Sequence, residues 1–116
     1  MKTATLFVAE TIALSQSVTS GAVNLRGAAD DGFFGIQLVL TGDGTAKVEY
    51  LESYNSVNFV TPSGAIEIVT GFTKTSGTSG VDVLTFEPEV CPYMKIKVTE
   101  TGGANSITVT VVLVVQ

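Results

Sequence analysis

The stretch that decides the fold is residues 34–50, FGIQLVLTGDGTAKVEY. Apolar side chains occupy every second position in both halves of it: Ile36, Leu38, Leu40, Ala46, Val48 and Tyr50. This period of two is typical of a strand that buries one face. Residues 42–44, Gly-Asp-Gly, separate the halves, and glycine tolerates the positive φ that a tight turn needs. The stretch therefore predicts a β-hairpin.

The same alternation recurs along the chain, and no segment has a sustained helical period. Residues 94–99 and 107–115 predict a second strong hairpin around the turn-forming residues 101–105. Short strands at regular spacing, with Gly, Asn, Asp or Pro between them, indicate a sandwich or barrel. We expect residues 1–116 to form one all-β domain: an antiparallel β-sandwich, jelly-roll or immunoglobulin-like, with about eight or nine strands.

The predicted last strand, residues 107–115, is apolar on both faces near its end. One face carries Ile107, Val109, Val111, Leu113 and Val115. The other begins with threonines but continues with Val112 and Val114, where a solvated face would remain polar. Either the N-terminal segment or another subunit should cover these valines. We expect a homo-oligomer, with contacts at Leu6, Phe7, Val112 and Val114.

Composition excludes several classes of function. The net charge of −5 and a pI near 4.4 disfavour nucleic-acid binding. Without histidine, and with Cys91 as the single cysteine, the chain lacks Ser-His and Cys-His nucleophilic sites and ordinary zinc sites. We expect Cys91 to behave as a small buried hydrophobic residue. No stretch resembles a signal peptide or a membrane-spanning helix, so we expect a soluble, non-secreted protein that is not an enzyme, binds no membrane and needs no cofactor or metal.

Carboxylates are the remaining catalytic material. Glu49 and Glu52 flank the end of one predicted strand, and Glu87 and Glu89 flank Pro88. Paired carboxylates can hydrolyse glycosides, but a domain of this size has little room for a substrate cleft. We expect all four glutamates to be solvated surface groups.

Two weaker ligand hypotheses remain. Residues 30–32, Asp-Asp-Gly, are a candidate calcium-binding pair, although we prefer a solvated loop. Tyr54 and Tyr93 are the aromatic side chains that could stack on a sugar, which makes a carbohydrate-binding or receptor-binding module the alternative function. That alternative requires the two rings to be exposed side by side.

Four stretches resemble small β-sandwich structural proteins from the virions of tailed bacteriophages and prophages. They are AVNLRG at 22–27, TGDGTAKVEY at 41–50, SYNSVNF at 53–59, and FEP at 86–88 followed by PYMKIKVTETG at 92–102. The resemblance implies a non-enzymatic virion component, made in the bacterial cytoplasm. It would be a capsid decoration protein or a tail or fibre accessory that packs against other virion proteins and against copies of itself.

Overall fold

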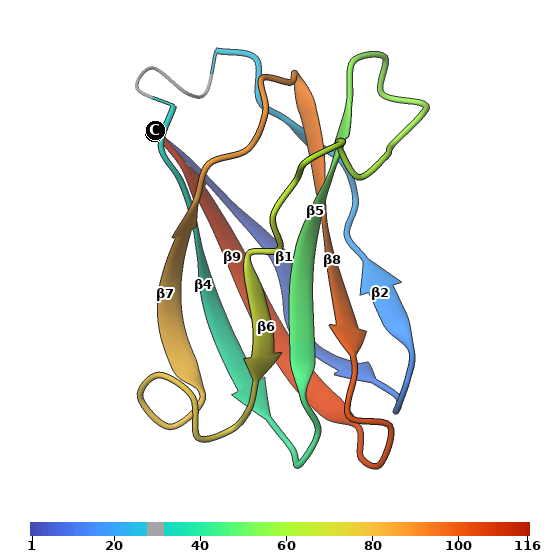
Figure 1. Cartoon of the computed structure of the whole chain (residues 1–116). Coiled ribbons are helices and arrows are strands. Elements are labelled where there is room, and N and C mark those ends of the chain that lie inside the picture. The colour runs from blue at the N-terminus through green and yellow to red at the C-terminus, as the bar shows by residue number, and fades with distance from the viewer. Residues whose placement is uncertain (28–31) are drawn as a thin grey trace.

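The computed structural model describes residues 1–27 and 32–116, and within these ranges all regular structure is β. The strands are β1 (Lys2–Ile12), β2 (Ser17–Thr19), β3 (Val23–Asn24), β4 (Phe34–Thr41), β5 (Ala46–Ser53), β6 (Val69–Phe72), β7 (Val81–Phe86), β8 (Tyr93–Glu100) and β9 (Ile107–Val115). They form two antiparallel sheets packed face to face (Figure 1). The predicted β-sandwich is confirmed.

The two strands of each predicted hairpin lie in different sheets. One sheet has the strand order β1-β9-β4-β7, and the other has the order β2-β8-β5-β6 with β3 also paired to β8. The turn at 42–44 therefore joins β4 of one sheet to β5 of the other, and the turn at 101–105 joins β8 to β9 in the same way. The four strands were predicted correctly, but the two predicted hairpins are wrong, because each of these turns crosses from one sheet to the other.

The core lies between the sheets and follows the predicted alternation. Every second residue of β4, β5, β8 and β9 is buried there, and the inward side chains of β9 are almost completely inaccessible: Ile107, Val109, Val111, Leu113 and Val115. Because β9 lies between β1 and β4, it hydrogen-bonds on both sides along its whole length. This strand is the centre of its sheet.

One end of the sandwich is held by a buried carboxylate that sequence reasoning missed. Glu100, at the end of β8, is 1% exposed. Its two oxygens accept hydrogen bonds from four backbone N–H groups, those of Ser15, Thr45, Gly102 and Gly103, at 3.1, 2.8, 2.7 and 2.8 Å. These bonds lower the pKa of Glu100 to about 2, because they stabilise the charged form. Glu100 therefore connects the β1–β2, β4–β5 and β8–β9 turns.

Candidate interaction surface

The outer face of the four-stranded sheet consists almost entirely of valine and threonine. We call it the Val/Thr face. Paired residues on neighbouring strands point to the same side of a sheet, so the register defines its members. They are Thr3, Thr5, Thr11, Gly35, Gln37, Val39, Thr41, Val81, Val83, Thr85, Thr108, Thr110, Val112 and Val114. None of these side chains is ionisable.

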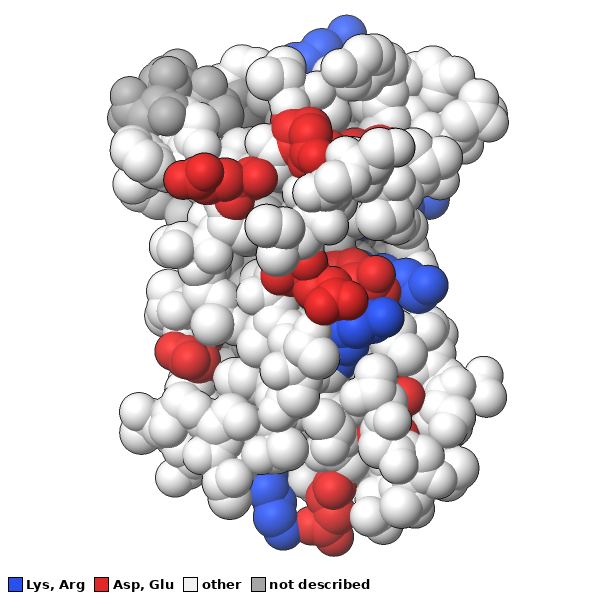
Figure 2. All heavy atoms as spheres, in the orientation of Figure 1, with Lys and Arg blue, Asp and Glu red and all other residues white. Residues whose placement is uncertain are grey.

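The outer face of the other sheet is different, because it carries both signs of charge. Lys47 and Glu49 project from β5, and Lys95 and Lys97 project from the neighbouring β8. The ammonium of Lys47 lies 3.5 Å from Glu49 and 4.0 Å from Glu67. Figure 2 shows acidic and basic side chains meeting near the middle of the side that carries β5 and β6. A face of this kind is suited to water.

The expected contact residues fall into two groups. Val112 and Val114 lie on the Val/Thr face, where both are half-buried. Phe7 does not, because the β-bulges on either side of it shift the register of β1 and turn its ring into the core, where it is 7% exposed. Leu6 packs against the same core. Phe7 is therefore not available to a partner, whereas Leu6 is half-buried and its contact with a partner stays a prediction.

The N-terminal segment does not cover Val112 and Val114. β1 pairs with the edge of β9, placing Thr3 beside Val114 and Thr5 beside Val112 in the plane of the sheet. It therefore extends the Val/Thr face by one strand. Of the two covers considered from sequence, the chain's own N-terminal strand is eliminated.

The Val/Thr face has a notch where Gly35 lacks a side chain. Gly35 lies between Thr85 of β7 and Val114 of β9 in the sheet register. The hollow has a volume of about 380 Å³, and its walls include Phe33, Val83 and Val114. Phe33 is 64% exposed although it is a large apolar residue. The notch is the main interruption in an otherwise continuous surface.

One of the two edge strands of this sheet, β7, is protected against pairing with another strand. The N–H group of Val83 donates to its neighbour Asp82 at 2.8 Å, and that of Val81 donates to the carbonyl of Thr78 at 3.2 Å. Edge strands whose polar groups are already occupied, and which carry an acidic side chain, pair poorly with other chains. The outer face is therefore a better contact surface than this edge.

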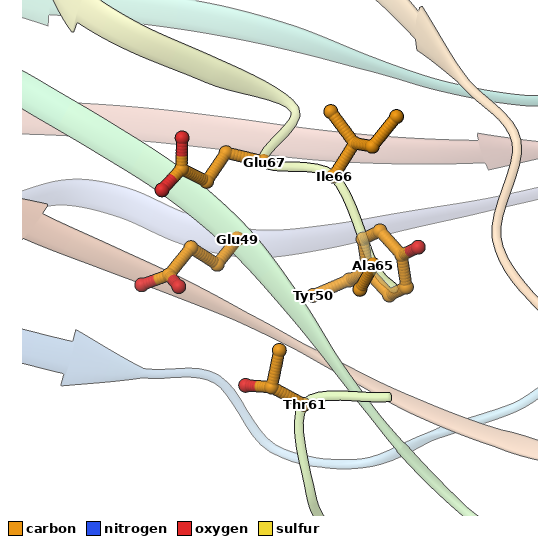
Figure 3. A pocket seen from close by; sticks show the side chains of 6 residues that line it. All are labelled: Glu49, Tyr50, Thr61, Ala65, Ile66 and Glu67. Atoms are coloured by element: carbon orange, nitrogen blue, oxygen red, sulfur yellow. The ribbon is translucent and has the colours of Figure 1, made fainter. Parts of the chain in front are cut away.

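A small hollow lies at the side of the sandwich, where the 61–68 segment passes β5. It has a volume of about 190 Å³ and is lined by Glu49, Tyr50, Thr61, Ala65, Ile66 and Glu67. Figure 3 shows the carboxylates of Glu49 and Glu67 extending to one side, away from the Tyr50 hydroxyl. The two carboxylates form ion pairs with the ammonium group of Lys47. The Tyr50 hydroxyl instead donates to Glu89 at 2.7 Å, and its ring stacks on Phe86. The carboxylates of Glu49 and Glu67 are therefore paired with one lysine, and Glu89 is paired with Tyr50.

Glu52 is not a solvated group, which corrects the expectation for that glutamate. It points into the sandwich with 4% exposure, and its Oε2 atom has no hydrogen-bond partner among the described residues. Burial raises its pKa, and the charge of Glu89 raises it further, whereas the nearby Cys91 thiol lowers it. Burial and the Glu52 carboxylate raise the pKa of Cys91 to about 12. A thiol with this pKa is a poor nucleophile near neutral pH.

The two candidate sugar-stacking tyrosines differ in their surroundings. Tyr54 is 79% exposed. Tyr93 is half-buried, and the guanidinium carbon of Arg26 lies 5.4 Å from its ring centroid. The face of the Tyr93 ring is therefore already occupied by a cation. This arrangement does not meet the requirement for two freely exposed rings.

The calcium hypothesis rests on Asp30 and Asp31, which lie outside the described residues. Within residues 1–27 and 32–116, no group of three or more acidic or cysteine side chains is placed to hold a metal ion. In the same ranges, no helix is long and apolar enough to cross a membrane.

Comparison with known proteins gives a structural similarity alone. No family model matches the chain, and no curated protein matches its sequence. Among solved structures, the chain is similar to PliG of Aeromonas hydrophila, a periplasmic lysozyme inhibitor of g-type lysozyme. The TM-score is 0.53, with 10% identity over 98% of this chain and 86% of that chain. At this identity the similarity shows the fold only.

These comparisons correct the expectation of a virion structural protein. That expectation rested on the resemblance of four sequence stretches to bacteriophage proteins. The similar solved structure is a periplasmic inhibitor, so it points away from a virion component. The quoted stretches are strand and turn patterns, and any β-sandwich uses patterns of this kind. We therefore draw no role in a virion, and no carbohydrate-binding role, from them.

Proposed function

We propose that this chain is a non-catalytic domain that self-associates through the Val/Thr face of its four-stranded sheet. The observation that carries the proposal is the absence of any ionisable side chain from the described part of that face. A solvated sheet face normally remains polar, as the opposite face of this molecule does. Val112 and Val114, at the centre of the face, are the residues that gain most from being covered.

Among the possible contacts between two copies of the chain, charge favours the one through the Val/Thr faces. Each copy carries a net charge of −5, so most encounters between two copies bring like charges together. Two Val/Thr faces bring no ionisable side chains into direct contact, so only the long-range repulsion between the two copies remains. Sheets with β-branched side chains also pack readily face to face, at a separation of about 10 Å.

The size of the face predicts a weak dimer. Four strands spaced about 4.8 Å apart, with an average length of about eight residues, present a face of roughly 500 Å². Two copies would then bury about 1,000 Å² in total, at the low end for a specific interface. We therefore expect a concentration-dependent equilibrium between monomer and dimer, with a dissociation constant in the micromolar range.

Sedimentation velocity over a concentration series tests the proposal. Val112→Glu places a charge at the centre of the face and should leave only monomer. Gln37→Glu adds the same charge with almost no change in shape, at an exposed position paired with Val112, and should weaken association at least tenfold. This second variant separates an effect on association from an effect on folding.

Leu51→Glu is the matched control. Leu51 is also half-buried on the outer face of a central strand, but it belongs to the opposite sheet, beside Lys95. It should associate as the wild type does. A wild-type chain that remains monomeric at high concentration would contradict the proposal, and so would equal effects of Leu51→Glu and Gln37→Glu.

A further inference from the structure

We infer that the Phe33 ring of each copy inserts into the Gly35 notch of the other copy, and so fixes how two Val/Thr faces dock. This inference rests on the proposed self-association and names the contact that specifies it. The exposed Phe33 side chain lies two residues before Gly35, where the apolar hollow is, along the same extended segment of the chain. The ring needs an apolar surface to cover it, and the hollow needs an apolar group to fill it.

The backbone of Phe33 is fixed in position by hydrogen bonds, while its side chain is exposed. Its N–H group donates to the carbonyl of Gln116 at 2.7 Å, and the N–H group of Gln116 donates to the carbonyl of Phe33 at 2.9 Å. These two bonds continue the β4–β9 ladder by one pair, so the backbone of Phe33 is fixed although its side chain is 64% exposed. A fixed aromatic residue loses little conformational entropy on binding.

The notch is not filled by the chain's own Phe33. At the position that a Cβ atom of residue 35 would occupy, the nearest atoms are the carbonyl oxygen of Leu84 at 3.3 Å and a methyl group of Thr85 at 3.9 Å. No atom of Phe33 lies within 4 Å of that position. The hollow of about 380 Å³ is therefore open toward solvent, with room for an aromatic ring.

A dimer with a two-fold axis can bury the Phe33 rings and fill the Gly35 notches of both copies. In a symmetric dimer, whatever residue 33 of one copy contacts, residue 33 of the other copy contacts in the same way. Phe33 of each copy can therefore enter the notch of its partner, where Val83 and Val114 form apolar walls. Each copy gives one ring and receives one.

Two single variants test the contact. Phe33→Ala removes the ring, and Gly35→Val fills the notch. Residue 35 has no positive φ, so its backbone accepts valine, but the 3.3 Å approach to the Leu84 carbonyl oxygen requires β7 to shift slightly. Burying an aromatic anchor is a large part of the energy of small interfaces, so each variant should raise the dissociation constant of the homodimer about tenfold or more. Thermal unfolding of the monomers at low concentration checks that both variants fold.

Mixing the two variants provides the decisive measurement. In the mixed dimer, Phe33 of the Gly35→Val chain enters the open notch of the Phe33→Ala chain, while the shortened side chain of the Phe33→Ala chain faces the filled notch. One insertion is restored and one steric conflict is removed. The mixed dimer, followed by labelling one chain and measuring fluorescence anisotropy, should therefore form more tightly than either variant associates with itself.

The outcomes separate this inference from the proposal on which it rests. If both variants associate like the wild type while Gln37→Glu weakens the dimer, the face is the interface but the insertion is wrong. If the mixture is no tighter than the single variants, the insertion is likewise wrong. A wild-type chain that remains monomeric contradicts both the insertion and the self-association.

Discussion

At the scale of single residues, the buried carboxylate of Glu100 should dominate the response to acid. Its pKa is about 2 in the folded chain against an ordinary value of 4.5. A lowered pKa means that Glu100 contributes stability above pH 4.5, and that this contribution is lost as the pH falls from 4.5 to about 2. Glu100→Gln should therefore reduce the free energy of unfolding at pH 7 by on the order of 3 kcal/mol.

Urea unfolding at pH 7 and near pH 3 measures this effect. The difference between wild type and Glu100→Gln should shrink at the lower pH, because the wild-type carboxylate is then losing its advantage. Glu87→Gln is a suitable control, since Glu87 is exposed, and it should change the unfolding free energy by less than about 0.5 kcal/mol. A constant difference at both pH values would contradict the role given to Glu100.

Glu52 should respond to pH in the opposite sense. Its pKa is raised in the folded chain, chiefly by burial, so its contribution to stability is present at low pH and is lost as the pH rises through its folded value. Glu52→Gln should remove this dependence and be at least as stable as the wild type at pH 7. The same change removes a charge that raises the pKa of Cys91. Alkylation of Cys91 by iodoacetamide at mildly alkaline pH should therefore become faster, while an unchanged rate would contradict the contact.

At the scale of elements, the β4–β5 turn should be intolerant of any side chain at Gly44. A Cβ atom there would lie 2.5 Å from the carbonyl oxygen of Asn105 and 2.7 Å from a methyl group of Ile107. Gly44→Ala should destabilise the fold by about 2 kcal/mol, because the two turns at this end of the sandwich must separate. Gly21→Ala has open space and should be neutral by the same thermal-unfolding measurement. Equal midpoints for the two variants would show that the turns do not pack in this way.

The β7 edge strand gives a second prediction, that Asp82 protects it from pairing with other molecules. Asp82→Val removes the carboxylate that accepts from Val83 and leaves an edge strand with no charged side chain and with valine at its first three positions. Such edges recruit strands of other molecules. The variant should aggregate at a lower temperature than the wild type in a light-scattering scan. Glu87→Gln removes the same charge just beyond the strand and should not, so aggregation of both would point to net charge instead of edge protection.

The strands were largely predictable from the sequence, whereas several buried or surface features were not. Alternation predicted the strands of residues 34–50 and 107–115 because it records which face is buried, and it identified Val112 and Val114 as an unusual surface. It misplaced Phe7, since the bulges in β1 break the period of two. Glu52 and Glu100 were beyond its reach, because a charged residue is normally exposed and only the packing of distant loops buries these two. The Gly35 notch requires knowing that Thr85 and Val114 flank it.

At the scale of the whole molecule, the charge distribution predicts the effect of salt on self-association. An interface without ionisable groups has no ion pairs to screen, whereas two copies of net charge −5 repel each other at a distance. Raising the NaCl concentration from roughly 0.05 M to roughly 0.5 M should leave the dissociation constant unchanged or lower it. Sedimentation equilibrium measures this directly, and a dimer that weakens in salt would indicate a charged interface elsewhere on the molecule.

The central position of β9 also determines when the protein can fold. Residues 107–115 pair with both β1 and β4, so the four-stranded sheet has no middle until this late segment has left the ribosome. Until then, β1 and β4 carry apolar faces with nothing between them. Folding of this sheet therefore waits until residues 107–115 have left the ribosome, and the apolar faces of β1 and β4 are open to aggregation until then.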